Sequence, residues 1–381
     1  MLASTGGRRL VVLVRRTAAT DCLQPQVTRL LDQYYSSTPL ERTPNPDAAS
    51  YLGATCGLSP AAAAAAFRSV RISSTAKADK VVALLRRHGF SDADIARMLP
   101  KSPTLLCLDP DKVVGPKLEY LAAVGVPAAV IAQTNVLSRS LDDNIVLSIE
   151  FIRGIVGTDT RIQRAVSRYP KVLEFNLAKN SRAALEALRR HGLTEKAISE
   201  LVVIYISVLK MTPSRIAGIF KDLEMLGVTI TTPGFLRCFA QMCKLKSETA
   251  WRRLALYQSF GLSKDQVVKA FLTQPQILAF TDETIQRKLL FFQDDLKISL
   301  SRVIARPSAF ACSMEKNILP KCAVLSVLMR DGMIQRDINL VDALAKSTGR
   351  FSERYVKKYE KDVPDVVRAY EGKIEFNGFK D

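Results

Sequence analysis

The chain has 381 residues, of which 48% are hydrophobic, and this is enough to form a sizeable buried core. Its formal net charge of +18 at pH 7 is typical of a protein with a polyanionic partner, either a nucleic acid or an anionic membrane surface. The longest apolar run covers residues 201–209, about half of the roughly 18 residues that a transmembrane helix needs. We therefore expect no insertion into a membrane.

The first twenty residues, MLASTGGRRLVVLVRRTAAT, contain four arginines and no acidic residue. The apolar stretch between the arginines is too short for a secretory signal, and an arginine-rich, acid-poor amphipathic start is typical of an organelle transit peptide. We expect residues 1–40 to be such a leader for the mitochondrion, with the chloroplast as the alternative; a disordered basic tail is the other interpretation. Residues 41–381 still hold 50 basic and 35 acidic side chains, so the basicity does not depend on the leader.

Motifs that end in glycine recur along the chain at intervals of 32 to 36 residues. They are RRHG at Gly89, AAVG at Gly125, GIVG at Gly157, RRHG at Gly192, EMLG at Gly227 and QSFG at Gly261. A glycine just past a helix typically adopts the left-handed conformation that caps the helix, so the recurrence marks one repeated unit. One interval further on the chain reads DDLK, ending at Lys297, and the next interval falls on Gly332.

A proline motif recurs with the same period. LPKSPTLL, SRYPKVL, LTQPQIL and IARPSAF contain Pro103, Pro170, Pro275 and Pro307, which lie two, three and one repeats apart. A proline inside a helix costs about 3 kcal/mol, so its recurrence predicts a turn that ends a helix at the same place in each unit. Residues 136–141, 204–209 and 241–246 keep the apolar pattern of this motif without the proline.

Each unit is thus predicted to contain a first helix after the glycine, a stop at the proline, a short apolar turn and a longer second helix, such as 111–123 or 284–294. One unit cannot bury its apolar side alone, so we expect an all-α solenoid of stacked repeats of about 35 residues. Residues 41–76, which include the alanine-rich YLGATCGLSPAAAAAAFRSV, are expected to form an N-terminal capping unit. Residues 77–370 would form the repeats, and 371–381 a polar tail.

This repeat, with its L/V-x-x-x-P-x-x-L motif, resembles the mitochondrial transcription termination factor family, mTERF, from about residue 46 to 370. YLGATCGL followed by HGFSDADIARMLPKSPTLL is similar in particular to the plant branch of that family. The resemblance implies a right-handed superhelix, curved into a half-ring with a basic groove, in mitochondria or chloroplasts. It also implies a role in organelle transcription or its termination, in transcript maturation or in intron splicing.

When the units are aligned on the proline, one position of the first helix carries a row of cations. The position six residues before the proline holds Arg97, Arg164, Arg237 and Lys269, and Lys101 and Arg168 follow one helical turn later. A cation at the same point of each unit can follow a phosphate backbone. The row has gaps at Gln133, Glu200 and Ser301, and a solvated polar face is the alternative interpretation.

The second helices add further candidates, most of them in residues 151–260, which carry 18 basic and 8 acidic side chains. These candidates are Arg182, Arg215, Arg252 and Arg253. Nucleic-acid contacts from both helix sets would then come mainly from the middle third of the chain.

Catalytic and metal motifs are missing from the sequence. It has no Walker loop and no G-x-G-x-x-G, and its only histidines, His88 and His191, each precede a capping glycine, so we expect neither an enzyme nor a cofactor. The seven cysteines have no zinc-type spacing and favour structural thiols in a reducing compartment.

Binding is therefore the expected function. The low aromatic content of 7% argues against a protein that recognises single-stranded nucleic acid by stacking bases on aromatic side chains. We expect a monomer that binds double-stranded DNA or structured RNA, alongside other organelle gene-expression proteins and without a small-molecule substrate. The alternative is a helical-repeat scaffold for an acidic protein. Phosphate contacts carry no sequence information, so the residues do not distinguish DNA from RNA.

Overall fold

The structure is a computed structural model that describes residues 53, 61 and 75–379. The chain divides into two units, Met1–Arg71 and Ile72–Asp381. Within residues 75–379 every regular element is a helix or helical turn, and none of them has the length and apolarity needed to cross a membrane. The predicted leader, residues 1–40, lies outside the described residues, as does the predicted capping unit apart from Gly53, Ala61 and the first residues of a helix that begins at Thr75.

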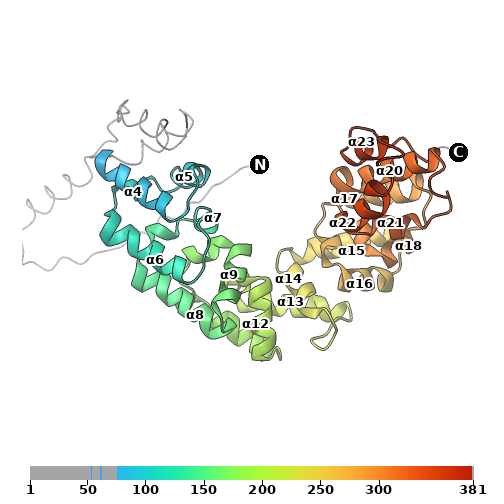
Figure 1. The fold of residues 1–381 in the computed structure, drawn as a ribbon. Coiled ribbons are helices and arrows are strands. Elements are labelled where there is room, and N and C mark those ends of the chain that lie inside the picture. Colours follow the sequence, from blue (N-terminus) through green and yellow to red (C-terminus); the bar gives the residue numbers. More distant parts are fainter. Residues whose placement is uncertain (1–52, 54–60, 62–74, 380–381) are drawn as a thin grey trace, which may run out of the picture. The chain divides into compact units, whose positions relative to one another are not determined.

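First helices follow the glycines and stack on one another in chain order (Figure 1). They are α5 (Asp92–Met98), α7 (Ala128–Ile131), α9 (Asp159–Arg168), α12 (Glu195–Ile204), α14 (Phe235–Met242), α16 (Lys264–Thr273) and α18 (Leu300–Ala305). Along this layer α9 contacts α12, α12 contacts α14, α14 contacts α16, and α16 contacts α18. Ser91 and Ser263 cap α5 and α16, each accepting a hydrogen bond from the backbone N–H three residues on, as helix starts commonly do.

The predicted turns follow the first helices. Pro103, Pro170 and Pro275 begin the 3-10 turns η1 (Pro103–Cys107), η5 (Pro170–Glu174) and η7 (Pro275–Leu278), and Pro307 begins α19 (Pro307–Phe310). Turns η3 (Val136–Ser138) and η6 (Ile206–Lys210) form without a proline, because their buried apolar residues, such as Leu137 and Val208, hold them in place. Proline therefore reinforces the turn without being required for it.

Second helices form the other layer, in which α11 contacts α13, α13 contacts α15, and α15 contacts α17. They are α4 (Thr75–Arg87), α6 (Gly115–Ala123), α8 (Leu147–Val156), α10 (Leu177–Asn180) with α11 (Arg182–Arg190), α13 (Pro213–Met225), α15 (Ser247–Ser259), α17 (Asp282–Leu290) and α20 (Leu319–Arg330). Wider π-helical turns adjoin four of them, namely η2 (Pro110–Val114), η4 (Leu141–Val146), η8 (Phe291–Asp295) and η9 (Met314–Ile318). The helices predicted over 111–123 and 284–294 are both present within these bounds. The all-α solenoid of repeats is confirmed.

The seven glycines that mark the repeat, from Gly89 to Gly332, have positive φ angles between 67° and 88°, as helix-capping glycines do. The DDLK segment keeps the same backbone shape, since Lys297 has φ of 52° and is the one non-glycine residue with positive φ among the described residues. The period thus continues through a unit that has no capping glycine.

Buried lysines join three of the second helices, α6, α17 and α20, to the following unit. Lys117 Nζ donates to the Leu137 carbonyl at 2.8 Å, Lys288 Nζ to Phe310 at 2.6 Å and also to Cys312, and Lys321 Nζ to Leu344 at 3.0 Å and Lys346 at 2.6 Å. These lysines are at most 6% exposed. Their acceptors lie where a turn or short helix ends and its last carbonyls have no helical partner. Part of the positive charge therefore holds the repeats together.

The last elements close the stack. They are α21 (Leu340–Leu344), α22 (Thr348–Phe351), η10 (Ser352–Lys357) and α23 (Asp365–Tyr370), which packs on α20. The tail predicted to be polar contains Ile374, Phe376 and Phe379, and these three side chains pack against the core of this last part.

Candidate nucleic-acid interface

A cleft of about 720 Å³ opens where four successive first helices and their turns meet. Arg168 at the end of α9, Arg237 on α14 and Lys244 just after α14 line it, and no carboxylate does. Uncompensated cations in a recess attract anions, because the surrounding protein screens their field less than water does. The repeat brings these side chains together: Arg168 ends α9, Arg237 lies in the first turn of α14, and Lys244 follows α14.

The hydrogen bonds of the two arginines fix their place in the cleft. Arg168 Nη1 donates to the Val203 carbonyl at 3.0 Å, and Arg237 Nη2 donates to the Leu272 carbonyl at 3.4 Å. Each arginine thus reaches the next first helix, 35 residues further along the chain. A guanidinium has five N–H donors, so one such bond leaves others for a phosphate group.

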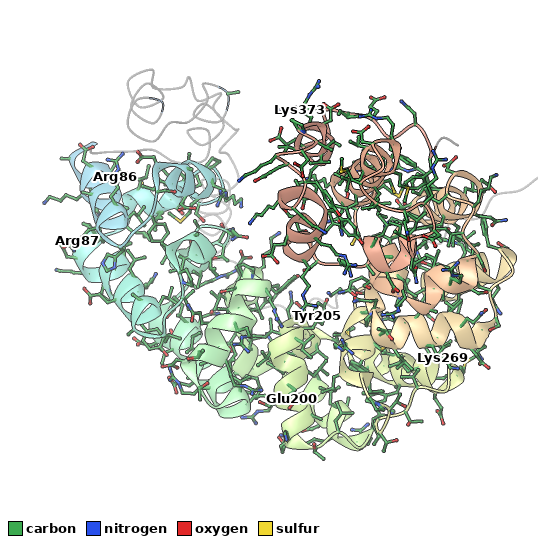
Figure 2. The ribbon with its side chains drawn as sticks, turned by 45° about the vertical axis from the view of Figure 1, so that its right-hand side comes forward. Arg86, Arg87, Glu200, Tyr205, Lys269 and Lys373 are labelled. Carbon is green, nitrogen blue, oxygen red and sulfur yellow. The ribbon has the colours of Figure 1, made fainter. Side chains whose placement is uncertain are left out.

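Two tyrosines line the same cleft at equivalent points of their units. Tyr169 and Tyr205 have ring centroids 6.5 Å apart, and Lys244 Nζ lies 5.5 Å from the Tyr205 centroid. Burial raises the pKa of Tyr205, so its hydroxyl stays protonated and can donate a hydrogen bond. Figure 2 marks Tyr205 together with Glu200 of α12 and Lys269 of α16.

Gln241 lines the cleft and is only 6% exposed, yet its Nε2 has no hydrogen-bond partner. Buried amide groups are nearly always paired, because leaving a donor unsatisfied costs about 1–3 kcal/mol. The atom itself is buried, so an acceptor from a bound molecule would reach it once the side chains that cover it shift. The cleft thus combines three cations with an unused amide donor.

The other predicted residues of the cation row lie outside the cleft. Arg164 on α9 and Lys269 on α16 are exposed, as is Lys101 after α5. Arg97 is also exposed but forms an ion pair with Asp94 at 3.1 Å. Of the predicted row, the structure brings only Arg168 and Arg237 together in one cleft.

The four candidates from the second helices have mixed surroundings. Arg182 is exposed at the start of α11. Arg215 is half-buried and donates to the carbonyls of Met242 and Leu245, and Arg252 pairs with Asp282 at 2.7 Å.

Arg253 is not placed to contact a nucleic acid. Its side chain is 10% exposed, and its guanidinium is taken up by the Leu278 carbonyl at 2.7 Å and by Asp282 at 3.2 Å. It joins α15 to the following turn as the buried lysines do elsewhere. The correction has a physical reason: a buried guanidinium bonded inside the protein cannot reach a phosphate without unpacking the unit.

Sequence reasoning missed Lys244, Gln241 and the tyrosine pair. A signal for the tyrosines was present, because Tyr169 follows Arg164 by five residues and Tyr205 follows Glu200 by five. Gln241 lies four residues after Arg237, in the register of Lys101 and Arg168. Extending the alignment to the turn, and to polar as well as charged residues, would have singled out the tyrosines and Gln241.

Comparison with known proteins agrees with this repeat architecture. A family model described as mTERF matches residues 70–352. Over 300 residues the chain is 22% identical to "Transcription termination factor MTERF15, mitochondrial" of Arabidopsis thaliana, covering 77% of this chain and 58% of that protein. Over 227 residues it is 16% identical to "Transcription termination factor MTERF8, chloroplastic" of the same plant, covering 58% of this chain and 45% of that protein. The chain thus spans about half the length of these relatives.

The matched residues 70–352 include the glycine and proline motifs from Gly89 to Gly332 and every residue that lines the cleft. The resemblance predicted from those motifs is therefore confirmed: the chain belongs to the mTERF family, in its plant branch.

Proposed function

We propose that the protein binds nucleic acid in an organelle and acts there in gene expression, in transcription and its termination or in the processing of transcripts. The names of the two relatives support an organelle role in transcription termination, one in the mitochondrion and one in the chloroplast. We propose the mitochondrion first, because of the arginine-rich leader, with the chloroplast as the alternative. The observation that carries the binding proposal is the carboxylate-free cleft of Arg168, Arg237 and Lys244.

In this proposal the cleft holds consecutive phosphates of double-stranded DNA or structured RNA. The three cations would pair with phosphate oxygens, and Gln241 Nε2 would donate to an oxygen of the same backbone. Arg97, Lys101, Arg164 and Lys269 would extend the contacts to neighbouring units, with Arg182, Arg215 and Arg252 giving weaker contributions from the second helices. Arg253 is left out. The protein would act by binding as a monomer, without catalysis.

The test is binding of the full chain to matched duplex DNA, single-stranded RNA and folded intron-like RNA, titrated over salt. With six to ten phosphate contacts, affinity should fall by roughly 10³ to 10⁵ between 50 and 200 mM salt. The preferred ligand distinguishes a role in transcription from one in RNA processing. Absence of binding to all three at low salt would favour the alternative, a scaffold for an acidic protein.

A triple variant locates the interface. Replacing Arg168, Arg237 and Lys244 with alanine should lower the slope of log affinity against log salt by about 2.7 on duplex DNA, because each lost phosphate contact removes about 0.9. The matched control replaces Arg87, Lys196 and Lys221, which are exposed and lie outside the cleft, and should change the slope much less. Circular dichroism checks that both variants stay folded. Equal slopes in a folded triple variant and the wild type would exclude this cleft.

A further inference from the structure

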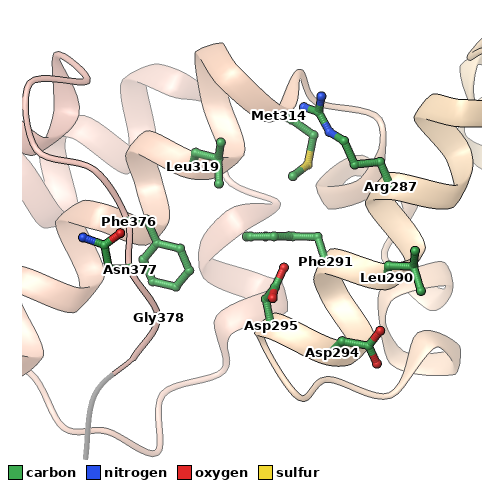
Figure 3. Close-up of a pocket in the computed structure, with 10 residues that line it drawn as sticks. All are labelled: Arg287, Leu290, Phe291, Asp294, Asp295, Met314, Leu319, Phe376, Asn377 and Gly378. Carbon is green, nitrogen blue, oxygen red and sulfur yellow. The ribbon is translucent and has the colours of Figure 1, made fainter.

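A second hollow, of about 860 Å³, lies between second helices near the end of the stack. It is lined by α17 and η8 on one side and by Met314 and Leu319 of η9 and α20 on another, and the tail residue Phe376 closes it (Figure 3). We call it the α17–α20 groove. Its elements are second helices and the tail, whereas the cationic cleft is formed by first helices and their turns, so the two share no residue.

The floor and one edge of the groove are apolar. Phe291 and Phe376 have ring centroids 6.2 Å apart, and Figure 3 shows their rings facing the hollow from different elements. Leu290, at the edge, is 47% exposed, which is a large apolar surface to leave in water at about 25 cal/mol per Å². The groove is open, so it suits side chains that project from another backbone better than it suits an enclosed small molecule.

The charge of the groove is opposite to that of the protein. Asp294 and Asp295 are exposed in its lining, and among the described residues neither forms an ion pair. The one cation of the lining, Arg287, is paired with Glu315. Two free carboxylates beside an apolar floor, in a chain of net charge +18, attract cations and repel phosphates.

The tail that closes the groove is held by few bonds. Residues 374–379 contain no regular element, and the Gly378 carbonyl accepts a hydrogen bond from Ser326 Oγ at 3.3 Å. The tail is otherwise fixed by the apolar contacts of Ile374, Phe376 and Phe379. An irregular segment held in this way can shift locally at little cost, which would widen the groove for a helix.

We propose that the α17–α20 groove binds a basic amphipathic helix of a partner protein. The partner's large apolar side chains would pack on Leu290, Leu319 and Phe376, and its lysines or arginines would pair with Asp294 and Asp295. This is the helix-in-groove mode of recognition, in which an apolar stripe gives affinity and flanking charges fix the orientation. Because the groove shares no residue with the cleft, the protein could hold nucleic acid and this partner together.

The probe is a fluorescent helical peptide of leucine and lysine with its leucines on one face, and the control peptide has glutamate for every lysine. Both are titrated against the full chain by fluorescence anisotropy. The lysine peptide should bind in spite of the protein's net positive charge and weaken as salt is raised. The glutamate peptide should bind at least tenfold more weakly if Asp294 and Asp295 are the contacts.

Two variants locate the binding site. Asp294→Asn with Asp295→Asn should weaken peptide binding by about tenfold, since exposed ion pairs contribute modestly, and Leu290→Ser should weaken it independently by removing apolar contact. The matched control, Asp337→Asn with Glu360→Gln, removes two exposed carboxylates from loops outside the groove and should leave the affinity within twofold of the wild type. Thermal melts check folding.

Four results would overturn the proposal. The first is no binding of the lysine peptide at low salt, and the second is equal affinity in the wild type and in both folded groove variants. The third is self-association of the wild type in sedimentation velocity that Asp294→Asn with Asp295→Asn abolishes, because the groove would then receive a second copy of the chain. A photo-crosslinking version of the peptide should label residues of α17 to α20, and labels confined to other elements would also contradict it.

Discussion

Replacing Lys297 with glycine should stabilise the protein. Lys297 stands where seven other units have a capping glycine, and its φ of 52° places it in the left-handed region. Its side chain is exposed and forms no ion pair among the described residues, so the substitution breaks no ion pair there. What changes is the conformational cost of a residue with a Cβ atom in this backbone shape.

The size of the effect follows from two opposing terms. A left-handed conformation costs a non-glycine residue about 1–2 kcal/mol, and the substitution relieves this cost. Glycine also makes the unfolded chain more flexible, and this lowers the free energy of unfolding by about 0.4–1 kcal/mol. The expected net gain in the free energy of unfolding is about 0.5–1 kcal/mol, and a change of this size moves the melting temperature of a protein this large by about 1–4 °C.

The reverse swap gives the matched control. Gly261 has φ of 83°, and a Cβ atom built there would meet nothing within 4 Å, so Gly261→Lys tests the backbone cost alone. It should lower the free energy of unfolding by about 1 kcal/mol, since the same two terms now act in the opposite direction. Neither substitution touches the cleft, so nucleic-acid binding should not change.

Equilibrium unfolding in urea, followed by circular dichroism, measures both variants against the wild type. The midpoint should rise for Lys297→Gly and fall for Gly261→Lys, with unchanged slopes, because the surface exposed on unfolding stays the same. A lower midpoint for Lys297→Gly would mean that the lysine makes a stabilising contact, and the inference from backbone conformation would then be wrong.

Four further substitutions test the packing of the repeats. Burial lowers the pKa of Lys288 to about 8, below its usual value, so the unfolded chain binds more protons than the folded one between about pH 8 and 10.5. The free energy of unfolding of the wild type, relative to Lys288→Met, should therefore rise with pH across that range. A difference that does not change with pH would contradict the assigned pKa. Arg253→Ala should lower the free energy of unfolding by about 3 kcal/mol, because the Leu278 carbonyl and Asp282 each lose a buried partner. Arg252→Ala removes an exposed ion pair and should cost less than about 1 kcal/mol. Equal losses of the two variants in urea unfolding would refute this distinction. Pro170→Ala should cost only about 1 kcal/mol, since η3 and η6 form without proline, and a melt showing loss of the fold would show that proline is essential.

The architecture could be predicted from the sequence because the residues that define the repeat determine the backbone conformation close to themselves. A capping glycine and a helix-ending proline determine the backbone within a few residues of themselves, so their period marks the units and even locates Lys297. The same reasoning could not place the side chains of Arg215 and Arg253. Their acceptors lie 25 to 30 residues further along the chain, in the next unit, and only the packing of neighbouring units determines which carbonyls they meet.

The candidate interface was predicted in part for the same reason. Helical spacing placed Arg237 and Arg168 one turn apart on the same face of the first helix, and stacking of the units brings both into one cleft. Lys244 lies beyond the end of α14, where helical spacing no longer applies. Gln241 was missed because its importance comes from an unsatisfied donor, and whether a donor is satisfied depends on contacts between units that a single helix does not reveal.

Net charge alone is therefore a poor guide to how many cations are available for a partner. Lys117, Lys288 and Lys321 are buried against carbonyls of the following unit, and Arg253 is held in the same way. These cations act on the stacking of units, so removing one should lower stability first and binding only as a consequence. Arg168, Arg237 and Lys244 line an open cleft without carboxylates, so removing them should lower the salt dependence of binding while the fold persists. Stability and salt slope measured on the same variants thus distinguish the two groups of cations.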